Sequence, residues 1–201
     1  RTTHKELETL KNNYKEKILI LNADVTDYGA IKKCRADAEK AVTHIDIIIN
    51  NVGVWLDHER LQLDDERFDF DLILKEFDIN TVGPLRIIRE FIDLVKKSEL
   101  KTIINISSEA GSIGMHSWRK GEFAYCMSKT ALNCASNIIE FTYKDDGIKV
   151  YAVDPGWIKT DMSGPEAPIE PSESATDIIN LAESPRKNFI FCNRKGEKYD
   201  W

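Results

Sequence analysis

The sequence predicts an α/β protein built on a doubly wound parallel sheet, a three-layer α/β/α arrangement with helices on both faces. Short apolar runs rich in branched residues alternate with longer segments of helical character along the whole chain. Connected by right-handed crossovers, such alternating elements form a parallel sheet covered on both sides. Polar or glycine-containing turns follow the apolar runs, as expected where a ligand binds beyond the carboxyl ends of the strands. We expect the 201 residues to form a single domain.

Each predicted strand is an apolar run that is too short for a helix and long enough for a buried strand. In chain order, the predicted strands are residues 17–21, 45–49, 102–106, 149–153 and 188–192. The predicted helices are residues 3–14, 28–42, a long stretch from about 65 to 97, 121–144 and 172–182. Strand and helix therefore alternate from one end of the chain to the other.

The composition, with 42% hydrophobic and 31% charged residues, is that of a soluble globular protein. No apolar run approaches the ~18 residues of a membrane-spanning helix, so we expect no membrane insertion. A net charge of -6 would repel a polyphosphate, which makes nucleic acid a poor partner. The four cysteines lack Cys-x-x-Cys spacing, which favours reduced thiols and a cytoplasmic protein. The four histidines show no metal-ligand spacing, and we predict no metal site.

Four turns are predicted to meet at one edge of the sheet. Residues 22–27, 50–53, 107–111 and 154–157 each follow one of the first four predicted strands. Because parallel strands end at the same edge, these turns would converge on one crevice. Each turn also has an ordinary structural explanation, such as Asp24 or Asp27 capping the next helix, or Ser108 bonding to local backbone. Taken together at one sheet edge, they favour a ligand site.

Tyr125 and Lys129 stand four residues apart on the predicted helix 121–144 and therefore share one face. An ordinary tyrosine, with a pKa near 10, is a weak acid at neutral pH. A neighbouring ammonium favours the ionised phenol, so we expect Lys129 to lower the pKa of Tyr125. A Tyr-x-x-x-Lys pair can also be a simple surface pair on a helix, and Ser108 upstream favours the functional interpretation.

These residues resemble the short-chain dehydrogenase/reductase superfamily, and the resemblance implies a Rossmann-type fold. Its motifs are Asp-Val-Thr at 24–26, Asn-Asn-x-Gly at 50–53, Asn80, Asn-Ile-Ser-Ser-x-x-Gly at 105–111, Tyr-x-x-x-Lys at 125–129, and Pro-Gly followed by Thr at 155–160. Residues 154–168 and the ending 196–201 are similar to the C-factor and sniffer-like carbonyl reductase branch.

The resemblance implies an oxidoreductase that reduces the carbonyl of an aldehyde or ketone with hydride from NADPH. Tyr125 would donate a proton to the carbonyl oxygen, and Ser108 would hydrogen-bond that oxygen as charge develops. Lys129 would tune Tyr125 and hold the nicotinamide ribose. Asn80 would hold a water that extends the proton path.

The resemblance also implies a cofactor site. Asp24 and Val25 would contact the adenine, Asn50 the adenosine ribose region, and Ile158 with Thr160 the nicotinamide carboxamide; Tyr125 and Lys129 would also contact the cofactor. NADP is the expected cofactor, with NAD as the alternative, and Arg1 stands where a cation commonly selects the extra phosphate of NADP. The expected partner is a small-molecule carbonyl or alcohol substrate. The helix 121–144 often forms dimer contacts in relatives, so a homo-oligomer is a further expectation.

The sequence departs from the family pattern in three places. Val52 replaces the usual alanine, and the interval between Ser108 and Tyr125 is longer than the common spacing. None of the ten glycines forms a Gly-x-x-x-Gly-x-Gly or Gly-x-Gly-x-x-Gly turn, so we expect the first βαβ unit to be missing. The natural protein would then carry roughly 30 more residues upstream. The alternative function is a non-catalytic relative that kept the fold for protein binding or signalling.

Overall fold

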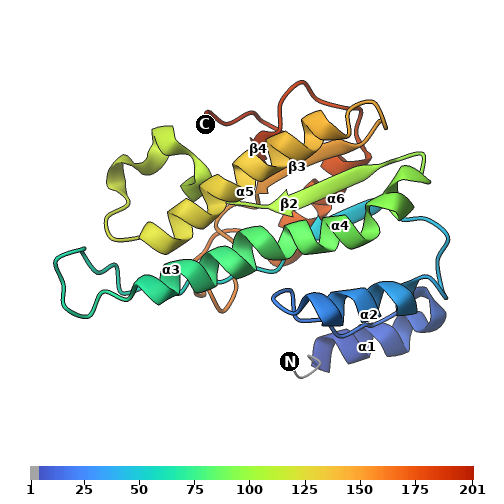
Figure 1. Cartoon of the computed structure of the whole chain (residues 1–201), viewed down its shortest axis with the longest axis horizontal. Helices are drawn as coiled ribbons and strands as arrows, with labels where there is room; N and C mark the ends of the chain where they lie inside the picture. The colour runs from blue at the N-terminus through green and yellow to red at the C-terminus, as the bar shows by residue number, and fades with distance from the viewer. Residues whose placement is uncertain (1–4) are drawn as a thin grey trace.

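The structure, a computed structural model, describes residues 5–201, with side chains described at 7–115 and 119–201. Its centre is a four-stranded parallel sheet in the order β1-β2-β3-β4 (Figure 1). In register, Asn50 pairs with Asn105 across β1 and β2, and Ile106 pairs with Val153 across β2 and β3. All strands therefore end at the same edge of the sheet. The strands are β1 (Ile47–Asn50), β2 (Thr102–Ile106), β3 (Lys149–Asp154) and β4 (Phe191–Asn193).

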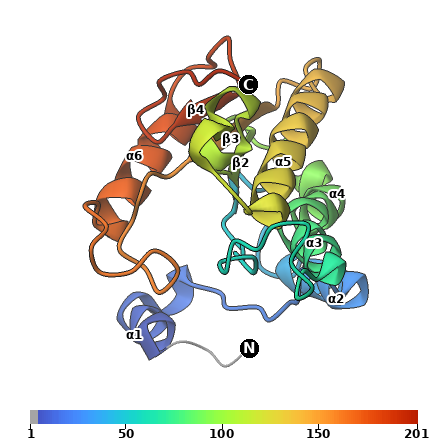
Figure 2. The same cartoon turned by 90° about the vertical axis from the view of Figure 1, so that its left-hand side faces the viewer.

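Helices cover both faces of this sheet. Figure 2 shows α4 and α5 on one side of the strands and α6 on the other, while α2 packs against α4. The predicted doubly wound, three-layer arrangement is confirmed. The α-helices are α1 (Lys5–Tyr14), α2 (Tyr28–Ala38), α3 (Phe70–Phe77), α4 (Gly83–Lys96), α5 (Phe123–Thr142) and α6 (Pro171–Glu183). The short 3-10 helices are η1 (Lys15–Lys17), η3 (Glu109–Gly111) and η4 (Ile113–Trp118).

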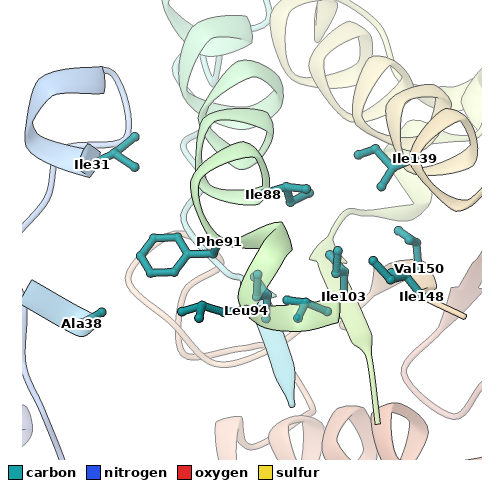
Figure 3. Packing of buried hydrophobic residues seen from close by; sticks show 11 residues of the cluster. Ile31, Ala38, Ile88, Phe91, Leu94, Ile103, Ile139, Ile148 and Val150 are labelled. Atoms are coloured by element: carbon teal, nitrogen blue, oxygen red, sulfur yellow. The ribbon is translucent and has the colours of Figure 1, made fainter. Parts of the chain in front are cut away.

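Two hydrophobic clusters hold the layers together. The first lies between the sheet and the helices α2, α4 and α5 (Figure 3). Ile103 of β2 and Val150 of β3 belong to this cluster, whereas the next residues, Ile104 and Tyr151, belong to the cluster beneath α6. Side chains alternate between the faces of a strand, which is why neighbours enter different clusters. Full burial of one such aliphatic or aromatic side chain contributes about 1.5–3 kcal/mol.

The predicted strand at residues 17–21 is wrong. The strand predicted at 102–106 is confirmed with its bounds, and the other three are confirmed with shifted ends. After η1 the chain continues without regular structure as far as the turn before α2. A strand needs a hydrogen-bonded neighbour, and within residues 5–201 β1 pairs only with β2. Leu19 is accordingly 55% exposed, and Ile49 on the outer strand is 40% exposed.

The helix predicted from about residue 65 to 97 begins at Phe70 and contains a wide turn. A π-helix, η2 (Asp78–Val82), joins α3 to α4, and the three form one continuous rod in Figure 1. Gly83 donates its N–H to the carbonyl of Asp78 in the π pattern. Pro84 has no N–H to donate to the carbonyl of Asn80 one turn earlier, which accounts for the wide turn. Such turns frequently mark functional sites.

Candidate active site

Side-chain amides join the strand ends to one another and to α5. Asn50 is the last residue of β1 and donates from Nδ2 to Oδ1 of Asn105 on β2 at 2.8 Å. Asn105 in turn donates to the Ser136 hydroxyl on α5 at 2.8 Å. The amide of Asn50 is thus directed into the protein, where it aligns β1 with β2. Its predicted contact with the cofactor stays a prediction.

One face of α5 is packed closely against the turn after β2. The hydroxyl of Ser107 donates to Asn133 Oδ1 at 2.6 Å, and Asn133 Nδ2 donates to the Gly111 carbonyl at 3.0 Å. A Cβ at Gly111 would lie 2.5 Å from Asn133 Nδ2 and 3.0 Å from the backbone carbonyl carbon and oxygen of Lys129. Glycine therefore allows the close approach that brings α5 over the strand ends.

This approach brings together three of the predicted site residues. The Ser108 hydroxyl lies within reach of the Tyr125 phenol, and hydrogen bonding with it acts to lower the pKa of the tyrosine. The ammonium of Lys129 lies 5.7 Å from the centroid of the Tyr125 ring and donates to the carbonyl of Ile106 at 2.9 Å. Ile106 ends β2, so the lysine is fixed directly at the carboxyl edge of the sheet. Ser108, Tyr125 and Lys129 meet at that edge, as the motifs predict.

The expected lowering of the Tyr125 pKa is wrong as a net effect. Burial raises the pKa of Tyr125 to about 12, although the hydrogen bond with Ser108 opposes the increase. Burial also lowers the pKa of Lys129 to about 8, because the low-dielectric interior disfavours the ammonium. The removal of the phenol from water has a larger effect on its pKa than the nearby positive charges have. The spacing of two residues along one helix does not reveal how deeply a side chain is buried.

Asn80 fastens the loop after β1 to α5. Its Oδ1 accepts from the N–H of Val54 at 2.8 Å, and its Nδ2 donates to the Val54 carbonyl at 2.9 Å and to the Ser128 hydroxyl at 3.0 Å. Asn80 is fully buried and is the middle residue of the wide turn, η2. Its side chain is therefore a structural tie beside Lys129, and the predicted water stays a prediction.

Glu76 is a buried acid that the sequence did not single out. The residue is 0% exposed, accepts from the N–H of Leu56 at 3.0 Å, and accepts from Asn80 Nδ2 at 3.3 Å. Burial is the main cause that raises the pKa of Glu76 to about 7, and the positive charge of Lys129 opposes it. The sequence feature that could have indicated Glu76 is its position one helical turn before Asn80. Most polar residues at such positions face water, so this feature does not predict a buried acid.

The raised pKa of Glu76 predicts a pH-dependent stability. The unfolded value is about 4.3, so the stabilisation is fully present below that pH and is lost as the pH rises through about 7. We expect this carboxyl to lower the free energy of unfolding by about 2–3 kcal/mol between about pH 5 and pH 8. Glu76→Gln should remove that part of the pH dependence in urea unfolding. Parallel pH curves for the variant and the wild type would contradict the assignment.

The predicted adenine contacts, Asp24 and Val25, lie in the turn before α2. Asp24 is exposed and accepts from the N–H and the hydroxyl of Thr26 at 2.9 and 2.8 Å. Asp27, rather than Asp24, caps α2. Val25 lies against the start of α4, where a Cβ at Gly83 would be 3.0 Å from the valine side chain. Asp24 is thus not used as the helix cap.

The predicted carboxamide contacts lie in the loop after β3. Ile158 forms a parallel bridge with Ile169, and Thr160 forms an antiparallel bridge with Gly164. The Thr160 side chain donates to the Ser163 hydroxyl at 3.3 Å, and the threonine is exposed. The loop after β3 is therefore ordered by these backbone bridges. Arg1, expected to select NADP, lies outside the described residues.

The environment of Lys129 fits the ribose of a nicotinamide cofactor. An ammonium has three N–H donors, and among the described residues the Ile106 carbonyl takes one of them. Gly53 faces the lysine: a Cβ there would lie 3.4 Å from Lys129 Nζ and 3.5 Å from Asn80 Oδ1. The absence of a side chain at Gly53 keeps space beside the ammonium, and a hydroxyl-rich ligand suits the remaining donors.

Charged residues near Tyr125 also escaped the sequence-based prediction. Arg119 donates to Glu122 Oε2 at 2.6 Å and to Glu109 Oε1 at 2.9 Å. The side chain of Glu122 is 1% exposed, and its other oxygen lies 2.9 Å from Arg60 Nε. The charge of Arg119 lowers the pKa of Tyr125, but by less than burial raises it. Glu109 and Arg60 come from other segments of the chain, so sequence spacing does not signal their ion pairs with Arg119 and Glu122.

Two kinds of feature are absent from residues 5–201. No group of three or more His, Cys, Asp or Glu side chains in the described part of the chain is arranged to hold a metal ion. None of the helices described there combines the length and apolar character that crossing a bilayer requires.

Comparison with known proteins agrees with this geometry. Residues 1–170 match the family of short chain dehydrogenases. The chain is 28% identical over 162 residues to C-signal of Myxococcus xanthus, and the alignment covers 78% of this chain and 93% of that protein. The carbonyl reductase Sniffer of D. melanogaster has a TM-score of 0.88 and 29% identity, with 98% of this chain and 83% of that chain covered. An NADPH-bound carbonyl reductase from chicken fatty liver has a TM-score of 0.87 and 27% identity, with 98% and 82% covered. The chain therefore belongs to the short-chain dehydrogenase family and groups with its carbonyl reductase branch.

Proposed function

We propose that the protein is an NADP-dependent reductase that converts an aldehyde or ketone to the alcohol. Membership of the short-chain dehydrogenase family supports an oxidoreductase. The observation that carries the proposal is the meeting of Ser108, Tyr125 and Lys129 at the carboxyl edge of the sheet, with the buried Lys129 ammonium 5.7 Å from the tyrosine ring. These groups form a proton donor, an oxyanion partner and a cation at the edge where open sheets bind ligands.

Tyr125 donates the proton to the carbonyl oxygen. Its pKa of about 12 keeps the phenol protonated at neutral pH, as this direction of reaction requires. Ser108 hydrogen-bonds the same oxygen as negative charge develops there. Lys129, with a pKa of about 8, is mainly charged at pH 7 and stabilises the phenolate left by proton transfer. Asn80 holds the water through which a proton returns.

When bound, NADPH would supply the hydride to the carbonyl carbon and leave as NADP+, and the proton from Tyr125 would complete the alcohol. Lys129 would hold the nicotinamide ribose through its remaining N–H donors. Ile158 and Thr160 would hold the carboxamide, Asn50 the adenosine ribose region, and Asp24 with Val25 the adenine. NADP is favoured over NAD by the likeness to the NADPH-bound carbonyl reductase from chicken fatty liver.

Titration of the protein with its natural amino terminus into NADPH, followed by cofactor fluorescence, tests the proposal. We expect saturable binding below about 50 µM, within the usual range for enzyme ligands. Lys129→Ala should weaken binding by about tenfold or more, since it removes a charged hydrogen-bond donor. Lys96→Ala is the matched control, because that ammonium pairs with Asp146 at 2.8 Å on the surface. Absence of binding at tens of micromolar would defeat the reductase proposal.

A second candidate is a signalling protein that kept the fold without the reaction. The alignment with C-signal, which covers 93% of that protein, favours it. This candidate predicts no NADPH-dependent turnover of any aldehyde or ketone. Saturable NADPH binding together with NADPH oxidation by a carbonyl substrate would exclude it.

A further inference from the structure

Asp57 lies far from Tyr125 in the sequence and next to it in the fold. Its Oδ2 accepts from the N–H of Ala124 at 2.7 Å, 67 residues further along the chain, and from the N–H of Tyr125 at 3.4 Å. These N–H groups belong to the first turn of α5, where no intrahelical partner exists. Glu122 occupies the N-cap position of α5 but makes no side-chain capping bond. Asp57 therefore caps α5 from the loop after β1.

The loop that carries Asp57 is fixed from its other side. Val54 is held through both its N–H and its carbonyl by Asn80, at 2.8 and 2.9 Å. Leu56 donates its N–H to Glu76 at 3.0 Å. Both holding side chains are 0% exposed, so neither bond competes with bulk water. The position of residues 54–57 is thus dictated by α3 and η2.

The same loop also contacts the tyrosine ring and the chain before α5. The ring of Trp55 lies 6.1 Å from the ring of Tyr125, tilted by 46°. Arg60 approaches Gly121 so closely that a Cβ at Gly121 would lie 2.1 Å from the Arg60 carbonyl oxygen. The loop therefore restrains Tyr125 at its backbone, at its ring and just before its helix begins.

We propose that Asp57 is a positioning residue for Tyr125, capping α5 so that the phenol meets Ser108 and the substrate carbonyl. The inference rests on the proposed reductase function and adds a residue to it. The second oxygen of Asp57 is buried and has no hydrogen-bond partner among the described residues. A buried oxygen without a partner costs free energy of folding. The two hydrogen bonds from α5 to the other oxygen account for the position of the Asp57 side chain. Displacement of a catalytic group by about 1 Å can cost about 100-fold in rate.

Three variants of the full chain test this role: Asp57→Ala, Asp57→Asn and, as a matched control, Asp69→Ala. Asparagine keeps an oxygen that can accept from Ala124. Asp69 caps α3 by accepting from the N–H of Asp71 at 2.9 Å, so its loss removes a comparable cap elsewhere. Asp57→Ala should lower kcat by about 10- to 100-fold with little change in KM for NADPH. Asp57→Asn should recover most of the rate, and Asp69→Ala should keep it.

Two measurements decide the structural part without relying on turnover. Hydrogen–deuterium exchange at the amides of Ala124 and Tyr125 should become several-fold faster in Asp57→Ala only. Nitration of Tyr125 by tetranitromethane, located by mass spectrometry, should also accelerate in that variant. Unchanged exchange and nitration would overturn the proposal, as would equal losses of kcat in Asp57→Ala and Asp69→Ala. A wild-type protein that reduces no carbonyl compound would instead overturn the reductase function, while exchange and nitration still show whether Asp57 positions Tyr125.

Discussion

Tyr125→Phe is expected to lower kcat for carbonyl reduction by about 10²–10⁴-fold, the usual contribution of a general acid, while NADPH binding stays nearly intact. The variant loses the hydroxyl that lies near Ser108 but keeps the ring that packs 6.1 Å from the Trp55 ring. The Lys129 ammonium also stays fixed, because its bond runs to the Ile106 carbonyl. Steady-state oxidation of NADPH and fluorescence titration measure the two quantities separately.

Tyr151→Phe is the matched control for this loss. Tyr151 is 1% exposed on the side of the sheet that faces α6, and its hydroxyl accepts from the N–H of Lys187 at 2.9 Å. Removing that hydroxyl should cost some stability and leave kcat close to the wild-type value. Equal loss of turnover and cofactor binding in Tyr125→Phe would mean that Tyr125 is structural rather than catalytic.

Gly121→Ala is expected to lower the free energy of unfolding by about 2–6 kcal/mol. Gly121 has φ +74, where a side chain is strained by about 1–3 kcal/mol. In addition, its Cβ would lie 2.1 Å from the Arg60 carbonyl oxygen, and overpacking of this kind costs about 1–3 kcal/mol. The clash involves backbone on both sides, so it is relieved only by moving the loop or the start of α5. Urea unfolding measures the loss through the shift of the midpoint at constant slope.

Gly164→Ala separates the two causes. Gly164 has nearly the same backbone conformation, φ +80, but a Cβ there would meet nothing within 4 Å. This variant should therefore show only the conformational strain of about 1–3 kcal/mol. The difference between the two alanine variants measures the close contact between Arg60 and Gly121. Equal losses in the two variants would contradict that contact.

Much of the site could be predicted because its residues follow strands. Ser108 comes two residues after the apolar run that forms β2, and Tyr125 with Lys129 share a helical face. Once the strands are parallel, their carboxyl ends meet, so the order of the motifs along the chain predicts their convergence. The proximity of Ser108, Tyr125 and Lys129 in the fold agrees with that reasoning.

Asp57 and Glu76 could not be found in this way. In the sequence, Asp57 is one acid in a polar loop, and Glu76 is one polar residue in a helix. Their roles depend on partners such as Ala124, 67 residues from Asp57, and Leu56, 20 residues from Glu76. Helical or strand periodicity reports which face a residue occupies, but not which distant group covers that face.

The strand expected at residues 17–21 failed for a related reason. A run of apolar residues reports a preference for extended, buried backbone, but a strand exists only beside another strand. In the described structure β1 has β2 as its single neighbour, and Leu19 remains 55% exposed. Residues 17–21 thus have the local preference for a strand, but the described structure offers them no neighbouring strand to pair with.

The alternation of elements, the parallel sheet and the meeting of Ser108, Tyr125 and Lys129 follow from short-range patterns, since each depends on neighbours along the chain. Only the tertiary structure determines how completely each group is removed from water. Burial raises the pKa of Tyr125 to about 12, opposite to the direction expected from Lys129 alone, and raises that of Glu76 to about 7. Desolvation depends on every atom packed around a group, and these atoms come from β2, α3, α5 and the loop of Asp57, which meet only in the folded chain.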